Sequence, residues 1–148
     1  MRKTIAMLFL LVAFSSGYSQ NPVHWEFRSQ KINNETYEMH FIARIDSPWH
    51  IYSMANTDGS GVATTFDYSK NPLLQLNEPI NEKGNLVISK DQQTGIEFRY
   101  YEKFVEFVQV VNVKSTVKTK ISGNITYVAC TTTRCLPPAS AAFHFVLN

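Results

Sequence analysis

The sequence has little cysteine, and several common functional motifs are missing from it. Cys130 and Cys135 are the only cysteines among 148 residues, which excludes a disulfide-dense scaffold. There is no Gly-rich phosphate loop and no nucleophile elbow, and no pair of carboxylates has a spacing that indicates hydrolysis. These absences argue against nucleotide binding and hydrolysis, and we expect no cofactor.

Long hydrophobic runs are confined to the first residues. Arg2 and Lys3 precede an unbroken apolar run at 5–14, and Gly17 and Ser19 follow at the spacing of a cleavage site. This pattern predicts a signal peptide over residues 1–19. Ten apolar residues cover only about half of a bilayer core, so we expect no stable membrane insertion after cleavage. The predicted location is periplasmic or secreted, where a cysteine pair can be oxidised.

The charge of the remaining chain is balanced. Cleavage after residue 19 removes Arg2 and Lys3 and leaves 12 basic and 12 acidic residues. A neutral surface gives no support for binding nucleic acid or a membrane surface. Residues 20–148 are long enough to form one domain with its own core.

Hydrophobic residues alternate with polar ones along much of the chain, which predicts strands rather than helices. In the segment 35–45, for example, every second residue from Tyr37 to Ile45 is apolar. The other predicted strands are 25–28, 49–53, 104–113, 117–121, 125–129 and 142–147. Many short strands favour an all-β fold, with an immunoglobulin-like antiparallel β-sandwich as our first interpretation and an open barrel as the second.

Turn residues separate these runs. The predicted turns are 33–34, 58–61, 71–72, 78–79, 83–85 and 122–124. The segments 57–61 and 89–95 have the least hydrophobic pattern, so we expect them to be mobile loops.

The cysteine pair lies between two predicted strands, separated by the polar sequence Thr-Thr-Thr-Arg. A disulfide that closes so short a loop removes little entropy from the unfolded chain, so it is better suited to redox chemistry than to stabilisation. Arg134 neighbours Cys135, and positive charge lowers the pKa of a thiol. We therefore predict that Cys135 exchanges with partners and that Cys130 resolves the mixed disulfide.

Two other interpretations of the pair remain open. The disulfide could be an inert staple in an exported immunoglobulin-like binding module. Alternatively, Met39 or Met54 could join the two thiols in a copper(I) site. Two cysteines supply only half of a tetrahedral zinc shell, and we expect no metal.

Three blocks of sequence resemble one known family. The segment 128–138 contains both cysteines and Leu136-Pro137-Pro138, the segment 45–52 is aromatic, and the segment 98–107 is rich in Phe and Tyr. In order and spacing they are similar to the N-terminal periplasmic domain of the reductant conductor DsbD. The resemblance extends over residues 22–148.

The resemblance implies an immunoglobulin-like fold with Cys130 and Cys135 as the redox pair. It implies thioredoxin-like or membrane redox proteins as partners, and a role in supplying electrons to client oxidoreductases or cytochrome maturation. His50 and Tyr52 would surround the pair, and a cap within 88–98 would include Asp91. This chain has one residue fewer between its cysteines than the best-known members, and it contains no C-X-X-C pair.

Overall fold

The computed structural model describes residues 21–56, 61–77 and 79–148, and these residues form strands and no helix. The predicted signal peptide, Glu78 and most of the 57–61 segment lie outside the described residues. The strands are β1 (Val23–Lys31), β2 (Thr36–Ile45), β3 (His50–Tyr52), β4 (Thr65–Tyr68), β5 (Leu74–Leu76), β6 (Asn81–Lys90), β7 (Glu97–Val113), β8 (Thr119–Tyr127), β9 (Ala129–Cys130) and β10 (Ala139–Leu147). The predicted all-β class is confirmed.

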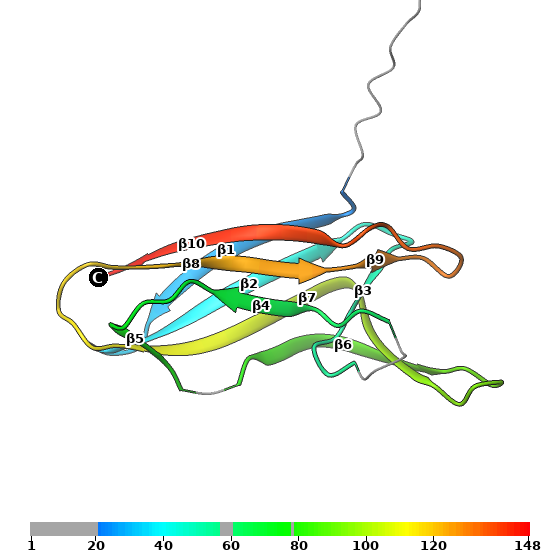
Figure 1. The fold of residues 1–148 in the computed structure, drawn as a ribbon, viewed down its shortest axis with the longest axis horizontal. Coiled ribbons are helices and arrows are strands. Elements are labelled where there is room, and N and C mark those ends of the chain that lie inside the picture. The colour runs from blue at the N-terminus through cyan, green and yellow to red at the C-terminus, as the bar shows by residue number, and fades with distance from the viewer. Residues whose placement is uncertain (1–20, 57–60, 78) are drawn as a thin grey trace, which may run out of the picture.

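The strands form two antiparallel sheets that pack face to face. The larger sheet has the order β1-β2-β7-β3-β9, with β5 and β6 also paired to β7, and the smaller sheet has the order β10-β8-β4. Figure 1 shows β10, β8 and β4 lying over the larger sheet. At 17 residues, β7 is long enough to pair with four other strands. This is the predicted immunoglobulin-like sandwich, not an open barrel.

The core between the sheets follows the alternation in the sequence. Tyr37, Met39, Phe41, Ala43 and Ile45 are all buried, as expected for one face of β2. The ring of Phe41 packs edge-on against other aromatic rings from both sheets, with centroids 4.9–6.0 Å apart. Burying a side chain of this size stabilises the fold by about 1.5–3 kcal/mol.

The turn predicted at 122–124 is wrong, because these residues lie inside β8. The reason is a close approach of the neighbouring strands to Gly123. A Cβ atom there would lie 2.1 Å from the Asp67 carbonyl oxygen and 2.5 Å from Cζ of Phe143. Glycine at this position therefore provides space in a strand rather than freedom in a turn.

The turn predicted at 83–85 is also wrong. These residues belong to β6, where the pairing with β7 shifts register between Gly84 and Leu86. Opposite the shift, Lys103 has a φ of 64°. This bulge lies where β7 changes partner from β3 to β2, so the glycine marks a bend in the sheet.

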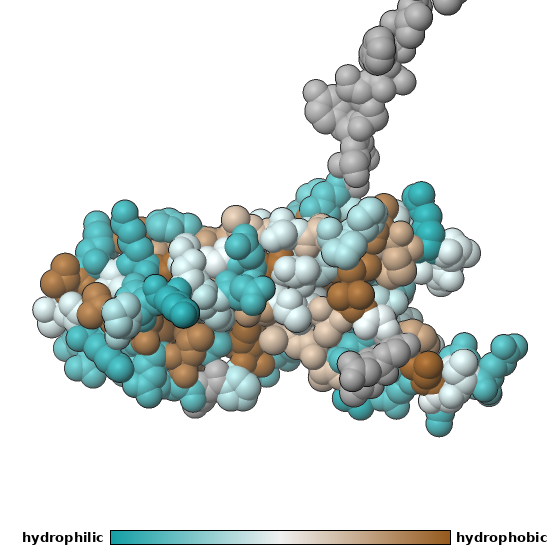
Figure 2. Space-filling model, in the orientation of Figure 1, coloured by the Kyte–Doolittle hydropathy of each residue, from teal (hydrophilic) through white to brown (hydrophobic). Residues whose placement is uncertain are grey.

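The visible surface has no single large hydrophobic area. Figure 2 shows hydrophobic and hydrophilic residues interspersed over the face that carries β10, β8 and β4. Across the parts of the chain that the structure describes, we find no helix with the length and hydrophobicity needed to span a membrane.

Candidate functional site

Cys130 and Cys135 form a disulfide at the end of β9, with their Cα atoms 4.0 Å apart. The intervening residues form a tight hairpin in which the Thr131 amide donates to the Arg134 carbonyl at 2.7 Å. The Thr131 hydroxyl accepts from the amides of Thr133 and Arg134. Threonine hydroxyls commonly stabilise turns in this way, which explains how so polar a sequence folds locally.

The two halves of the disulfide differ in exposure. Cys130 is 1% exposed, whereas Cys135 is exposed to solvent. In thiol–disulfide exchange, an attacking thiolate must reach one of the two sulfurs. The hairpin therefore presents Cys135 to solvent and keeps Cys130 inside.

Cys130 does not belong to the main core. It forms a separate small cluster with Tyr52 and Val128, against which Phe98 and Tyr100 pack. Neighbouring residues in the same strands, Ile51 and Ala129 among them, point into the main core instead. Because side chains alternate along a strand, the disulfide cluster lies on the opposite face of the larger sheet from the sandwich core.

His50 lies directly opposite Cys130 in the register between β3 and β9. Its ring is buried and lies 4.3 Å from the ring of Tyr100 and 5.5 Å from that of Tyr52. Burial lowers the pKa of His50 below its ordinary value of 6.5, and the charge of Glu102 opposes this shift. Burial therefore favours the neutral imidazole at this position.

Tyr52, like His50, is buried. The backbone of Gly61, with a φ of 98°, lies so close to the Tyr52 ring that a Cβ atom would be 2.7 Å from Cζ. The Thr64 hydroxyl donates to the Tyr52 carbonyl at 2.6 Å. Burial raises the pKa of Tyr52, and Tyr100 adds to the shift. Residues 61–64 thus pack directly onto the disulfide cluster.

Arg134 lies at the tip of the cysteine hairpin and is exposed. Its guanidinium carbon lies 5.1 Å from the centre of the Trp49 ring, a cation–π arrangement. Trp49 precedes β3, so this contact links the hairpin to the strand that carries His50.

Asp91 lies in the turn that joins β6 to β7, and its described contacts are local. Its carboxylate accepts hydrogen bonds from the amides of Gln93 and Thr94 and from the Thr94 hydroxyl. These bonds, chiefly that from the Thr94 amide, lower its pKa. Figure 1 shows the β6–β7 hairpin and the β9 region at the same end of the molecule, but no described contact joins Asp91 to the disulfide.

Two further residues cover Cys130. Phe98 is the last residue of the expected cap, and Tyr100 is a site residue that reasoning from sequence missed. Both side chains point to the face of β7 opposite to that of the core residue Tyr101. This alternation was the available signal, but it was not clear from the sequence because β7 changes its partner strand in this region.

A shallow apolar cavity of about 210 Å³ adjoins the hairpin. It is lined by Asn21, Tyr127, Ala129, Leu136, Pro137 and Ala139. Ala129, Leu136 and Pro137 lie within two positions of a cysteine along the chain, so the cavity adjoins the hairpin. It does so on the side of the main core, because Ala129 points to the face of the sheet opposite to Cys130. It is a suitable contact for an apolar side chain of a docking protein.

The methionines considered for a copper site lie elsewhere. Met39 is fully buried in the main core and Met54 packs against that core, whereas Cys130 lies in the other cluster. Within the described ranges, no group of three or more His, Cys, Asp or Glu residues is arranged to hold a metal ion.

The fold and the terminal disulfide hairpin define an all-β, immunoglobulin-like domain with an oxidised cysteine pair at one end. Solved structures of similar fold identify the kind of domain. The reduced N-terminal domain of DsbD from Neisseria meningitidis matches with a TM-score of 0.51 and 15% identity, over 82% of this chain and 85% of that chain. The N-terminal periplasmic domain of ScsB from Proteus mirabilis matches with a TM-score of 0.52 and 14% identity, over 82% of this chain and 45% of that chain.

The chain therefore has the fold of DsbD and ScsB N-terminal domains, as the resemblance in sequence predicted. At these identities the comparison defines the fold and not the activity. No protein-family model matches the sequence, and no curated protein does.

Proposed function

We propose that this protein is an exported thiol–disulfide exchange protein that relays electrons between redox proteins through Cys130 and Cys135. One observation carries the proposal: the only two cysteines of the chain form a disulfide with one exposed and one buried half. The fold shared with DsbD and ScsB N-terminal domains supports it. The proposed location is the periplasm or another oxidising space outside the cytoplasm.

In the proposed reaction, a thiolate of a reduced dithiol partner attacks Sγ of Cys135. The Cys130–Cys135 bond breaks, a mixed disulfide forms at Cys135, and Cys130 leaves as a thiolate. The second thiol of the partner then attacks its own mixed-disulfide sulfur and releases Cys135. Two electrons have moved, since the partner now holds the disulfide and this protein the two thiols. The same steps in reverse reduce the next protein.

The surroundings of each sulfur fit its part in this reaction. Arg134 supplies positive charge next to Cys135, which favours the thiolate of that residue. Cys130 leaves into a pocket of aromatic rings, and His50 lies opposite it in the sheet. We propose that the neutral imidazole of His50 takes up the proton of Cys130 when that thiol re-forms the disulfide.

The proposed partners are thioredoxin-like proteins or membrane redox proteins that carry a dithiol. The apolar cavity beside Leu136 and Pro137 supports a docking mode in which the partner packs an apolar side chain next to its reactive cysteine. Downstream clients would be oxidoreductases or cytochrome-maturation proteins. Phe98, Tyr100 and Tyr52 cover Cys130, so the partner approaches Cys135 first.

The test is a trapping experiment with two matched variants. Cys130→Ser leaves the exposed thiol, and Cys135→Ser leaves the buried one. Each is mixed with a thioredoxin-like protein whose resolving cysteine is replaced by serine and whose remaining cysteine carries thionitrobenzoate, which leaves when a thiol attacks that cysteine. We expect a mixed disulfide with the Cys130→Ser variant, mapped to Cys135 by mass spectrometry, and little with the Cys135→Ser variant. Equal trapping of both variants, or of neither, contradicts the proposal.

A binding module with a structural disulfide is the second candidate, and the burial of Cys130 favours it. The two candidates differ in reduction potential. A structural disulfide in an exported protein has a potential below about −300 mV, whereas exchange proteins lie higher. Equilibration of the protein with glutathione or dithiothreitol buffers measures this value directly.

A further inference from the structure

Three side chains that can hold a proton lie in one row across the outer face of the larger sheet. His50 on β3 lies opposite Glu102 on β7 and also opposite Cys130 on β9. Side chains directly opposite each other on neighbouring antiparallel strands have Cβ atoms about 4.5–5.5 Å apart. In each strand the adjacent residue points into the main core, so all three side chains of the row point to the opposite face.

The groups that face His50 come from three strands. Glu102 and Tyr100 lie on β7, Cys130 lies on β9, and Tyr52 lies on β3 itself. Of these groups, only Glu102 is charged at neutral pH while the disulfide is intact. Burial lowers the pKa of His50, and the charge of Glu102 opposes this effect. Glu102 thus stabilises the protonated form of an imidazole that burial alone would keep neutral.

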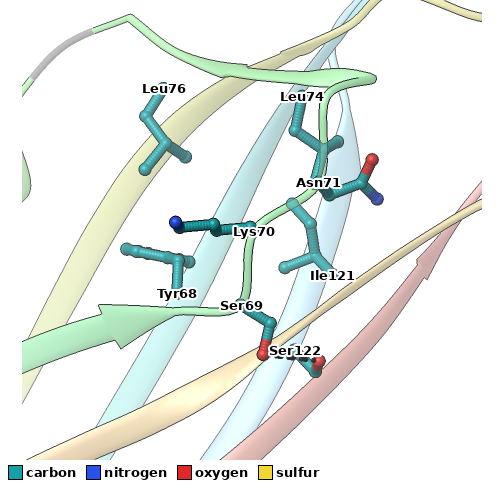
Figure 3. Close-up of a pocket in the computed structure, with 8 residues that line it drawn as sticks. All are labelled: Tyr68, Ser69, Lys70, Asn71, Leu74, Leu76, Ile121 and Ser122. Atoms are coloured by element: carbon teal, nitrogen blue, oxygen red, sulfur yellow. Dashed lines mark hydrogen bonds between the residues drawn. The ribbon is translucent and has the colours of Figure 1, made fainter.

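The carboxylate of Glu102 is exposed, and across the described part of the chain no hydrogen bond or ion pair joins it to another side chain. Other polar groups of the sandwich are paired with each other. His40, on the same face of the larger sheet, lies 2.8 Å from the Glu106 carboxylate. Figure 3 shows a hollow at the end of β4 where the hydroxyls of Ser69 and Ser122 point toward one another, 3.3 Å apart. The charge of Glu102 therefore acts on His50 without competition from a closer partner.

We propose that Glu102 is a positioning residue for the thiol–disulfide exchange and that it acts through His50. Its negative charge stabilises the imidazolium that forms when His50 takes the proton of Cys130. Because His50 stands between the other two members of the row, Glu102 favours the imidazolium more than it disfavours the thiolate. A base that is supported by a third group is a common means of activating a nucleophile. The inference rests on the proposed function, since it concerns the step in which Cys130 attacks.

That step begins with the mixed disulfide between Cys135 and a partner that entered the exchange as a disulfide. The Cys130 thiol passes its proton to a ring nitrogen of His50 and becomes a thiolate. The thiolate attacks Sγ of Cys135, the bond between Cys135 and the partner breaks, and the partner's sulfur leaves as a thiolate that takes the proton from His50. The two cysteines of this protein lose two electrons and the partner gains them.

The test follows the attack by Cys130 directly. The reduced protein is mixed with one equivalent of dithiobis(nitrobenzoate): attack by Cys135 releases the first thionitrobenzoate, and attack by Cys130 on the mixed disulfide releases the second. We expect this second phase to be about two- to fivefold slower in Glu102→Gln near pH 7, the size of effect that one exposed charge produces. The difference disappears at high pH, where Cys130 ionises without His50.

The chain offers a matched control in Glu106→Gln. This variant removes a carboxylate from the same strand and face, about 13 Å along β7 from Glu102, where it lies beside His40. We expect it to leave the second phase unchanged. Glu102 is exposed and glutamine has nearly the same shape, so neither a cavity nor a buried unpaired group arises in Glu102→Gln.

Two further measurements show whether Glu102 acts through His50. His50→Gln slows the second phase, and we expect Glu102→Gln to add no further slowing in that background. NMR titration of the ring nitrogens in the ¹⁵N-labelled, oxidised protein gives the pKa of His50 without any exchange reaction. This pKa is expected to be lower in Glu102→Gln than in the parent and unchanged in Glu106→Gln, and high salt reduces the difference.

The outcomes separate this inference from the proposed function. If the parent protein shows no second phase, the exchange itself is wrong and the role of Glu102 falls with it. If the second phase is present but equally fast in Glu102→Gln and Glu106→Gln, only the role of Glu102 is wrong. Equal slowing by Glu102→Gln with and without His50, or an unchanged pKa of His50, also overturns the inference, because Glu102 then acts by another route.

Discussion

The two hydrophobic clusters of this protein differ in size, position and content. The main cluster fills the space between the two sheets and draws on most of the long strands. The smaller cluster comprises Tyr52, Val128 and Cys130, with Phe98 and Tyr100 against them, on the outer face of the larger sheet. The first excludes water from a whole domain, whereas the second covers only one sulfur.

This difference separates stability from reactivity. Side chains of the main cluster touch many neighbours, so their removal leaves a cavity and destabilises the fold. Side chains of the smaller cluster touch few, so they can be altered with the domain still folded. We therefore expect substitutions in the first cluster to change unfolding and those in the second to change the chemistry of the disulfide.

The largest effect is expected from Phe41→Ala. This fully buried ring contacts aromatic residues from both sheets, and its removal costs about 3–5 kcal/mol. Denaturant unfolding measures the loss. The reduction rate of the disulfide by dithiothreitol, measured under conditions where the variant is folded, stays that of the parent. A faster rate would show that the clusters are coupled.

Gly123→Ala is expected to rank second. The added methyl group collides with the Asp67 carbonyl and the Phe143 ring, and overpacking of this kind costs about 1–3 kcal/mol. Asn124→Ala, at the next and exposed position of the same strand, is the control and leaves the midpoint of unfolding nearly unchanged. If both variants have the same midpoint of unfolding, the inference that neighbouring strands leave no space for a side chain at Gly123 is wrong.

Phe98→Ala tests the smaller cluster. Phe98 is half-buried, so the expected loss of stability is below the about 3–5 kcal/mol of a full core phenylalanine. Reduction of the disulfide by dithiothreitol becomes several-fold faster, because Cys130 loses part of its cover. Phe104→Ala, a partly exposed phenylalanine in the same strand, leaves the rate unchanged. An unchanged rate in Phe98→Ala would mean that Phe98 does not restrict access.

His50 gives this region a pH dependence of known sign. Its pKa is lowered in the folded protein, so the unfolded chain binds the proton more readily. The contribution of His50 to the free energy of unfolding is fully present above about pH 6.5, the pKa in the unfolded chain. It is lost as the pH falls from there through the pKa of the folded protein. His50→Gln flattens this part of the stability profile. The stability difference between parent and variant from pH 7 to pH 5 is the measurement.

The smallest effect is expected at the contact between Arg134 and Trp49. Exposed cation–π pairs contribute about 0.5–1 kcal/mol. A double-mutant cycle of Trp49→Ala and Arg134→Ala isolates the coupling energy, and the same cycle with Trp25 in place of Trp49 is the control. A coupling energy of zero in the first cycle would show that the contact between Arg134 and Trp49 does not stabilise the hairpin against β3.

Most of the fold could be predicted from sequence because the main core repeats one simple rule. Alternation in 35–45, 104–113 and 142–147 identified strands that bury every second residue, and the structure confirms these faces. Turn predictions based on glycine were wrong where residues distant in sequence determine why glycine is needed. Gly123 and Gly84 resemble turn residues, but each sits in a strand beside a close approach that only the paired strands create.

The site was predictable only in part. The close spacing of the two cysteines, with no other cysteine in the sequence, indicated the site, and the disulfide between them is confirmed. Of the residues that cover Cys130, Phe98 belongs to the expected cap, whereas Tyr100 was not evident, because it joins the cluster through pairings across β7 that periodicity alone does not define. The roles given to Arg134, His50, Tyr52 and Asp91 remain predictions, as does the signal peptide.

The unequal pairing along β7 sets a gradient of amide exchange. Around Val105 and Phe107 the strand is flanked on both sides, by β2 and β6, so these amides exchange with solvent only when the whole domain unfolds. Among the strands that the structure describes, only β6 pairs with β7 near Glu97 and Phe98, so we expect the ladder to fray there without disturbing the middle. One continuous strand thus runs from a doubly paired middle to a singly paired end, and the singly paired end is the one that covers the buried sulfur.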